Sequence, residues 1–265
     1  MKQYLVIGNP INHSLSPNLH NYWLKKNNIN GVYDKKKINE SDLKNLFFKI
    51  RNKEINGINV TVPFKKKVIP YLDNLTLEAE NTQSVNTIYL DDEKLVGHNT
   101  DISGFELAIK DTGYDVSNKQ ILILGAGGVV SSIIFALYEM NVSNISLCNR
   151  TKDKAESLKR LYKKLTIINW DEASNSDMII NATSVGLKKE DRLNLDFSKF
   201  QNAEFFYDVI YNPKETNFLK DARELKKKSE NGKKMFIYQA AEAFKIWHKI
   251  EPEINNDVID LLSND

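Results

Sequence analysis

Residues 121–132, ILILGAGGVVSS, decide the fold that we expect for this chain of 265 residues. The apolar residues before Gly125 predict a buried strand, and those after Gly128 predict a buried helix. Glycines at such a junction allow backbone N–H groups to approach a pyrophosphate, whose charge is stabilised by the positive end of the helix. The pattern is Gly-x-Gly-Gly and not the full Gly-x-Gly-x-x-Gly, so by itself it fits either a dinucleotide-binding loop or a tight strand-to-helix turn.

The next predicted strand, within residues 144–151 (NISLCNRT), indicates which dinucleotide is bound. In dinucleotide-binding folds an acid near the end of this strand binds the ribose 2′-hydroxyl of NAD. Here the strand ends in Asn149, Arg150 and Thr151, with Lys154 one turn later, and none of these is an acid. Only five of the 37 basic residues are arginine, and an arginine can pair with a 2′-phosphate. We therefore expect NADP rather than NAD, the alternative being a surface arginine after a strand.

The second half of the chain alternates apolar strands with helices, which predicts a doubly wound α/β domain. Its strands are apolar on both faces, as expected for parallel strands covered by helices. They are predicted at residues 119–125, 144–149, 165–169, 177–183 and 205–211, with a helix at residues 129–140. The strand ending in residues 181–184 (NATS) reaches the carboxyl edge of the sheet, where ligands bind, although these residues also fit a turn. Residues 225–234 are rich in lysine and fit a linker or a loose solvated surface.

The first hundred residues also alternate strands with helices. Strands are predicted at residues 3–8 and 55–63, a hairpin at residues 84–101, and helices at residues 16–26, 102–113 and 238–265. Ser16 and Pro17 open the first of these helices, and we expect the serine as N-cap and the proline at the first helical position.

Composition excludes several classes of protein. Lys+Arg total 37 against 35 Asp+Glu, so no strong field attracts nucleic acid or anionic lipid. The single cysteine, Cys148, excludes an intrachain disulfide or a cysteine zinc cluster and fits a reducing compartment. The uncharged residues 121–138 are interrupted by glycines, which favours a buried strand and helix over a membrane span. No export signal is evident, so we expect a cytoplasmic protein.

Residues 59–67, NVTVPFKKK, combine an alternating strand with a run of lysines. In an extended strand Ile58, Val60, Val62 and Phe64 would share an apolar face, and Asn59, Thr61 and Lys65 would share a polar one. The polar side chains suit a small polyhydroxylated anion, whereas the alternative is a half-exposed edge strand ended by proline.

Two serines and two histidines lie near the N-terminus. Ser14 and Ser16 could bind a carboxylate, or Ser16 could cap the helix that follows. We leave His13 and His20 out of the candidate site because lone histidines are more often structural.

Taken together, these segments resemble the shikimate dehydrogenase family, in family order and spacing over nearly the whole chain. The matching segments are GNPINHSLSP, NVTVPFK, SVNT, GHNTD, GAGG, NRT, NATSVG, YDVIYNPKET and QAAEAF. The resemblance implies NADPH-dependent, reversible reduction of 3-dehydroshikimate to shikimate, a step of aromatic amino-acid biosynthesis. It also implies an α/β substrate domain of residues 1–101 plus 236–265, whose last helix returns to it, and a Rossmann-like NADP-binding domain of residues 102–235.

The resemblance further implies roles for single residues, with Lys65 as the catalytic lysine and Asp101 as its partner. The substrate-binding residues that it implies are Ser14, Ser16, Asn59, Thr61, Lys65, Asn86, Asp101, Tyr211 and Gln239. The implied cofactor-binding residues are Gly125, Ala126, Gly127, Gly128, Val129, Asn149, Arg150, Thr151, Lys154, Thr183, Val209 and Gly232. The chain departs from the usual family pattern at Val209 and in the lysines after Gly232.

Two alternatives remain from the sequence. One is a quinate/shikimate dehydrogenase paralogue that uses NAD, and Arg150 with Thr151 argues against it. The other is a non-catalytic ligand-binding relative, which would be expected to lack Lys65 or Asp101. We expect a small-molecule substrate, no metal ion, no nucleic acid and no membrane partner, and either a monomer or a homodimer.

Overall fold

The computed structural model describes residues 1–170, 172 and 175–262. The chain forms two compact units, the first made of Met1–Gly104 and the part from Ile237 onward, the second of Phe105–Phe236. The sequence placed the boundaries a few residues earlier, after residues 101 and 235. Both observed boundaries fall inside helices, α4 (Asp101–Asp111) and α8 (Lys233–His248), which continue from one unit into the other. Because the composition does not change where a boundary falls inside a helix, the sequence alone does not mark the exact boundary.

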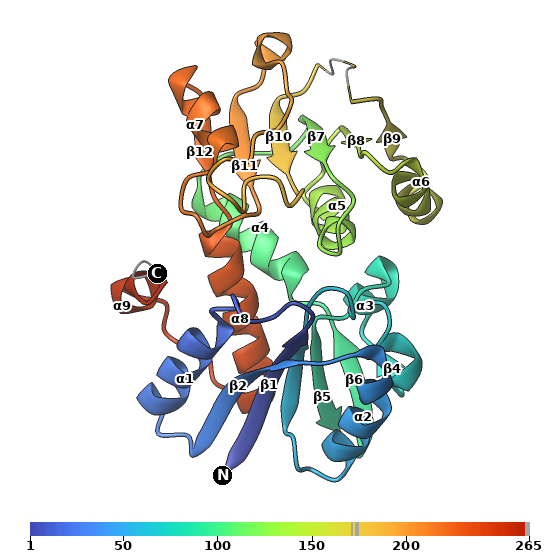
Figure 1. Ribbon diagram of the computed structural model, residues 1–265, viewed down its shortest axis with the longest axis vertical. Helices are drawn as coiled ribbons and strands as arrows, with labels where there is room; N and C mark the ends of the chain where they lie inside the picture. Colours follow the sequence, from blue (N-terminus) through green and yellow to red (C-terminus); the bar gives the residue numbers. More distant parts are fainter. Residues whose placement is uncertain (171, 173–174, 263–265) are drawn as a thin grey trace. The chain divides into compact units, whose positions relative to one another are not determined.

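The first unit contains a mixed six-stranded sheet of order β2-β1-β3-β5-β6-β4 (Figure 1). Its strands are β1 (Lys2–Gly8), β2 (Gly31–Lys37), β3 (Gly57–Val60), β4 (Asn74–Leu75), β5 (Thr87–Asp91) and β6 (Lys94–His98). Its helices, apart from α4 and α8, are α1 (Ser16–Lys26), α2 (Leu43–Arg51), α3 (Leu77–Thr82) and α9 (Asn256–Asp260). β1 is parallel to β2 and to β3, whereas β5 is antiparallel to β3 on one side and to β6 on the other, and β5 and β6 form the predicted hairpin.

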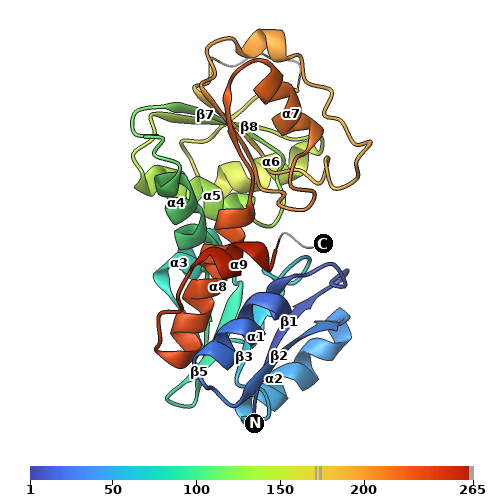
Figure 2. The ribbon, with the colours of Figure 1, turned by 90° about the vertical axis from the view of Figure 1, so that its left-hand side faces the viewer.

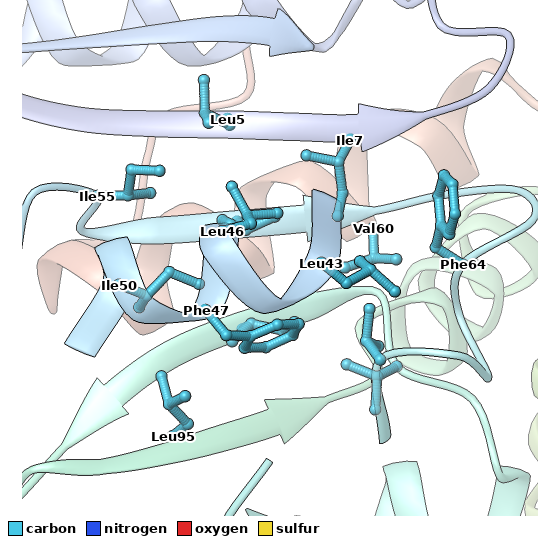
Figure 3. Close-up of a cluster of buried hydrophobic side chains, with 14 of the residues drawn as sticks. Leu5, Ile7, Leu43, Leu46, Phe47, Ile50, Ile55, Val60, Phe64 and Leu95 are labelled. Atoms are coloured by element: carbon cyan, nitrogen blue, oxygen red, sulfur yellow. The ribbon is translucent and has the colours of Figure 1, made fainter. Parts of the chain in front are cut away.

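One face of this sheet is covered by α2 (Figure 3). The helix directs Leu43, Leu46, Phe47 and Ile50 at the strands, a spacing that places all four on one helical stripe. They pack with a set of buried strand residues that includes Leu5, Ile7, Ile58, Val60, Ile88 and Leu95. Phe64 also belongs to this core, so the segment that leads to Lys65 is anchored by its apolar neighbour.

The other face of the sheet carries aromatic residues from α1 and α8, which lie on the same side in Figure 2. The ring of Trp247 packs on Tyr4 and Tyr33, and its Nε1 donates a hydrogen bond to the carbonyl oxygen of Ile88 (3.1 Å). A Cβ atom at Gly57 would lie 2.4 Å from this Nε1. Glycine is therefore required at residue 57, because the last long helix fills the space of a side chain.

The second unit is built on a parallel sheet of order β12-β11-β10-β7-β8-β9 (Figure 1). Its strands are β7 (Gln120–Leu124), β8 (Asn144–Cys148), β9 (Thr166–Ile167), β10 (Met178–Asn181), β11 (Phe205–Asp208) and β12 (Lys228–Glu230). Its helices, besides the shared α4 and α8, are α5 (Val130–Glu139), α6 (Lys152–Leu161) and α7 (Asn217–Glu224). The predicted doubly wound α/β fold is confirmed. The register pairs Leu124 with Asn181 and Asn181 with Asp208, so the ends of three central strands lie side by side.

Three sequence interpretations are wrong in detail. The lysine-rich residues 225–234 are not a linker, because Lys228–Glu230 form β12 and pair with β11. The strand predicted at residues 55–63 is shorter and ends at Val60, where a turn begins. Val62 consequently leaves the apolar face, and it is 53% exposed.

Among the described residues, no helix has both the length and the apolar composition needed to cross a membrane.

Candidate functional site

The first unit brings Lys65 and Asp101 together. Lys65 lies in the turn after β3, and its carbonyl oxygen accepts a hydrogen bond from the backbone N–H of Val85 (2.9 Å). Asp101 is the first residue of α4, where the positive end of a helix favours a carboxylate. The Nζ of Lys65 forms an ion pair with Oδ2 of Asp101, and the side chains are only 12% and 8% exposed. Lys66 and Lys67 are exposed, and Lys67 pairs with Glu40 at the surface.

Asn86 holds the carboxylate of this pair in place. Its Nδ2 donates to Oδ1 of Asp101 and to the hydroxyl of Thr100, both at 2.9 Å, and its Oδ1 accepts from the backbone N–H of Thr100 (2.8 Å). Both oxygens of Asp101 are therefore engaged, one by a cation and one by an amide. The orientation of Asp101 is fixed before any substrate arrives.

Ser14, Ser16 and Asn59 belong to one hydrogen-bonded network that also contains Tyr33. Ser14 donates to Ser16 (3.2 Å), Tyr33 donates to Oδ1 of Asn59 (2.7 Å), and Nδ2 of Asn59 donates to Thr87 (3.0 Å). Burial raises the pKa of Tyr33 well above its ordinary value, while a hydrogen bond with Ser16 acts in the opposite direction. Tyr33 was missed in the sequence because its strand, β2, was not predicted.

The expected N-cap role of Ser16 is wrong. The helix begins at Ser16 itself, and the cap position belongs to Leu15, whose side chain makes no capping hydrogen bond; Oγ of Ser14 instead accepts from the backbone N–H of Ser16 (3.4 Å). The hydroxyl of Ser16 is thus left to the network with Ser14 and Tyr33. Asn59 is buried, and its amide group is already bonded to protein atoms, so it supports neighbouring residues more than it offers donors.

His20 does not belong among the proton-transfer groups. Its ring stacks on Tyr33 with the centroids 4.1 Å apart, and Trp23, Phe244 and Trp247 surround it. Burial lowers the pKa of His20 to about 3, and the nearby His248 acts in the same direction. An uncharged ring at this place is part of the aromatic layer behind the network.

The remaining predicted substrate residues lie in both units. Thr61 is held by a hydrogen bond from its backbone N–H to Ile7 (2.9 Å). Gln239 is half-buried on α8, in the part of that helix that belongs to the first unit. Tyr211 belongs to the second unit, where its ring stacks on Phe236 with the centroids 4.5 Å apart.

The glycine loop of the second unit lies between β7 and α5. Gly125 has a φ of +104°, and a Cβ atom there would lie 2.8 Å from the carbonyl oxygen of Ala182. Glycine is thus required for the close approach of the loop to the end of β10. Among the described residues, no partner contacts the backbone N–H groups of the next four residues, which are Ala126, Gly127, Gly128 and Val129. Unpaired N–H groups just before a helix make a site for an anion such as a pyrophosphate.

The end of β8 presents basic and hydroxyl side chains beside this loop, because β8 pairs with β7. Asn149 stabilises the turn, with its Nδ2 donating to the carbonyl oxygen of Thr151 (2.7 Å). Arg150, Thr151 and Lys154 are exposed at the start of α6. These side chains fit a phosphate better than a free ribose hydroxyl, which would favour an acid.

Thr183, Val209 and Gly232 are brought together by the ends of β10 and β11. Both N–H and hydroxyl of Thr183 donate to Oδ1 of Asn181 (3.1 and 2.8 Å), and the N–H of Val209 donates to the carbonyl oxygen of the same asparagine (3.0 Å). A Cβ atom at Gly232 would lie 2.2 Å from the carbonyl oxygen of Val209. Sequence reasoning placed Asn181 only in the strand end 181–184 and missed Asp208, although an acid inside the apolar strand FFYDVIY is a visible signal.

These features define the class of the second unit as a dinucleotide-binding α/β domain. The unpaired N–H groups of the loop fit a pyrophosphate, and Arg150 fits a 2′-phosphate, so the donor set matches NADP. Within the described residues, no group of three or more His, Cys, Asp or Glu side chains could hold a metal ion.

Comparison with known proteins gives the family. A sequence model described as shikimate dehydrogenase substrate binding domain matches residues 6–88, and one described as shikimate / quinate 5-dehydrogenase matches residues 106–210. The chain is 56% identical over 261 residues to the NADP(+) shikimate dehydrogenase of Pelagibacter ubique, which covers 98% of each chain. This chain belongs to the shikimate dehydrogenase family.

Two crystal structures of shikimate dehydrogenases are similar to this chain over nearly its whole length. Shikimate dehydrogenase from Aquifex aeolicus has a TM-score of 0.91 at 37% identity, covering 100% of this chain and 98% of its own. The Thermus thermophilus enzyme, described as in complex with NADP(H) and shikimate, has a TM-score of 0.90 at 30% identity, with 99% of each chain covered.

Proposed function

We propose that this protein catalyses the reversible, NADPH-dependent reduction of 3-dehydroshikimate to shikimate, with Lys65 and Asp101 as its catalytic residues. The observation that carries the proposal is the buried ion pair of these two residues, held by Asn86, in a chain of this family. The names of its relatives support the substrate and the cofactor.

The ion pair suits the protonation that a ketone reduction requires. Bound NADPH supplies the hydride that the carbonyl carbon receives. The carbonyl oxygen then carries a growing negative charge, which a positioned ammonium stabilises and a proton must neutralise. Among the described residues Asp101 is the one acceptor for Lys65, so two of the three N–H donors of the ammonium remain for substrate oxygens. Lys65 and Asp101 act here as one proton-donating unit.

Substrate hydroxyls and the carboxylate need further partners. The hydroxyls of Ser14 and Ser16 are donors suited to the carboxylate, and Thr61 and Gln239 are suited to the ring hydroxyls, whereas Asn86 contributes by orienting Asp101. Asn59 contributes by fixing Tyr33. Tyr211 stays a proposed substrate residue on the resemblance to the family alone.

The cofactor is held, in this proposal, by the second unit. The N–H groups of the glycine loop bind the pyrophosphate, Arg150 and Thr151 bind the 2′-phosphate with Asn149 and Lys154, and Thr183, Val209 and Gly232 line the nicotinamide side. The basic strand end supports NADP over NAD. The single cysteine supports a reducing compartment, and we place the enzyme in the cytoplasm.

The test is an absorbance assay of NADP reduction with shikimate. We expect turnover with shikimate and NADP, and much lower kcat/KM with either quinate or NAD. Absence of turnover with shikimate and NADP in folded protein would reject the proposal. A preference for quinate with NAD would instead support the paralogue that acts on quinate.

A further inference from the structure

Asp208, the last residue of β11, is a fully buried carboxylate that none of the roles above uses. Its Oδ2 accepts hydrogen bonds from the hydroxyl of Thr216 (2.6 Å) and from Nδ2 of Asn181 (3.0 Å), and its Oδ1 accepts from the backbone N–H of Ile210 (3.0 Å). All three partners are neutral donors. The ionised carboxylate of Asp208 can only accept hydrogen bonds, so these three donors match its ionised form.

The partners of Asp208 connect it to the candidate cofactor residues. Asn181, held by Asp208, accepts both hydrogen bonds of Thr183 and the one from Val209. Ile210, also held by Asp208, accepts at its carbonyl oxygen the N–H of Gly232 (3.1 Å). One carboxylate thus fixes three residues at the carboxyl edge of the sheet, all within the second unit.

We propose that Asp208 is a positioning residue for the dinucleotide, which in its ionised form holds Asn181 and Ile210 and through them Thr183, Val209 and Gly232 in binding geometry. The inference deepens the proposed function, because it takes NADP as the ligand of this edge. It does not depend on which substrate the first unit binds.

The ionisation of Asp208 falls within an accessible pH range. Burial raises the pKa of Asp208 to about 6, while the hydrogen bonds from Thr216, Ile210 and Asn181 act in the opposite direction. The titratable neighbour on its own strand is Tyr207, which stays neutral because burial raises its pKa, and Glu230 on β12 interacts with that tyrosine. A proton on Asp208 would cause one of the three hydrogen bonds to be lost or, at the Thr216 hydroxyl, to reverse its direction, and the bonds that remain would lose the strengthening that the negative charge gives. We therefore expect dinucleotide binding to weaken as the pH falls through 6.

The experiment compares NADP binding to wild type, Asp208→Asn and Asp115→Asn. Asp115 is an exposed carboxylate of the same unit, so its variant controls for the loss of one charge. Binding is measured by fluorescence titration at pH 8 and pH 5.5, without turnover. At pH 8 we expect Asp208→Asn to bind NADP about tenfold more weakly, the size of effect when a buried hydrogen bond to a charged group is lost. Shikimate binding should be unchanged in all three proteins.

The pH dependence separates positioning from general damage. The 2′-phosphate of NADP titrates near the same pH, but equally in every protein, so the informative quantity is the difference between variants. Wild type and Asp115→Asn should lose more affinity between pH 8 and pH 5.5 than Asp208→Asn. Equal NADP affinity and an equal pH profile in Asp208→Asn and wild type would overturn the inference.

Thr216 provides a second test if Asp208→Asn does not fold. Thr216→Val removes one donor to Asp208, whereas Thr216→Ser keeps the hydroxyl. We expect weaker NADP binding in the first variant and recovery in the second, and equal affinity in both would overturn the inference. Absence of shikimate turnover together with the predicted order of NADP affinities would support this inference and reject the proposed function.

Discussion

Asp101 and Asp208 are both buried carboxylates, and the difference between them lies in their partners. Asp101 pairs with the ammonium of Lys65 and remains 8% exposed at its side chain. Asp208 is fully buried and is held by three neutral donors, and no cation among the residues that the structure describes forms an ion pair with it. A paired cation keeps a buried carboxylate charged and still reactive. At Asp208 burial raises the pKa to about 6, and the hydrogen bonds from the neutral donors only partly oppose this rise. The first arrangement suits chemistry and the second suits positioning.

Removing the cation of the reactive pair should have the largest effect. Lys65→Ala leaves Asp101 without its counter-ion and removes the donor for the substrate oxygen. We expect kcat for shikimate oxidation to fall by roughly 10²–10⁴-fold, the usual contribution of a general acid–base group, with NADP binding preserved. Steady-state kinetics with a circular-dichroism check of folding measures this. A kcat within a few-fold of wild type would mean that the ion pair is structural.

The buried carboxylate of Asp208 should make the free energy of unfolding depend on pH. In the unfolded chain Asp208 ionises near 3.8, and in the folded chain it ionises near 6. Because folding raises the pKa of Asp208, this residue contributes fully to the free energy of unfolding below pH 3.8, and its contribution is lost as the pH rises through 6. The free energy of unfolding of the second unit should fall by about 3 kcal/mol over this range relative to Asp208→Asn. Urea unfolding at a series of pH values tests this, and parallel curves for the two proteins would contradict it.

A smaller effect on catalysis is expected when the uncharged hydrogen-bond network around Tyr33 is disturbed. Tyr33→Phe removes the hydrogen bond to Asn59 and the one shared with Ser16. Since an ordinary hydrogen bond contributes about 1 kcal/mol, we expect KM for shikimate to rise by about fivefold to tenfold with kcat little changed. Tyr22→Phe is the matched control, because its hydroxyl bonds Asp257 at the surface. An equal change of KM in both variants would argue against a role for the network.

The smallest effect should come from the lysines next to Lys65. Lys66→Ala and Lys67→Ala change exposed side chains, and the pair between Lys67 and Glu40 is a surface ion pair of the kind that contributes little. Both variants should keep kcat and KM near wild-type values in the same assay. Losses comparable to that of Lys65→Ala would show that the lysine run acts as one basic patch.

The sequence predicted the parts of the fold that have strong periodicity. The apolar strands around the glycine loop and the hairpin that turns near Asp91 form where the periodicity indicated, and α4 ends at Asp111, two residues before Gly113. The edge strands β2 and β12 were missed because β2 ends in three lysines and β12 consists of three polar residues, which a solvent-facing edge tolerates. Val62 was placed on the wrong face because alternation was extended past the true end of β3.

For the site, side-chain chemistry was predictable and side-chain environment was not. Lys65, Asp101 and Asn86 could be named from their segments, and the structure brings them into contact. The role of Tyr33 depends on a strand pairing that only the fold supplies. Likewise, nothing in the letters of FFYDVIY indicates that the donors for Asp208 come from β10 and from Thr216.

The fit of Trp247 over Gly57 has a consequence for biosynthesis. One face of the sheet of the first unit is covered by α2, but the other face lacks Trp247 until the last part of α8 emerges, and that part follows the second unit along the chain. During translation the second unit can therefore complete its own core first, although it comes later in the sequence than the strands of the first. We expect the aromatic side chains on this face of the N-terminal strands to stay only partly covered until residue 247 has left the ribosome.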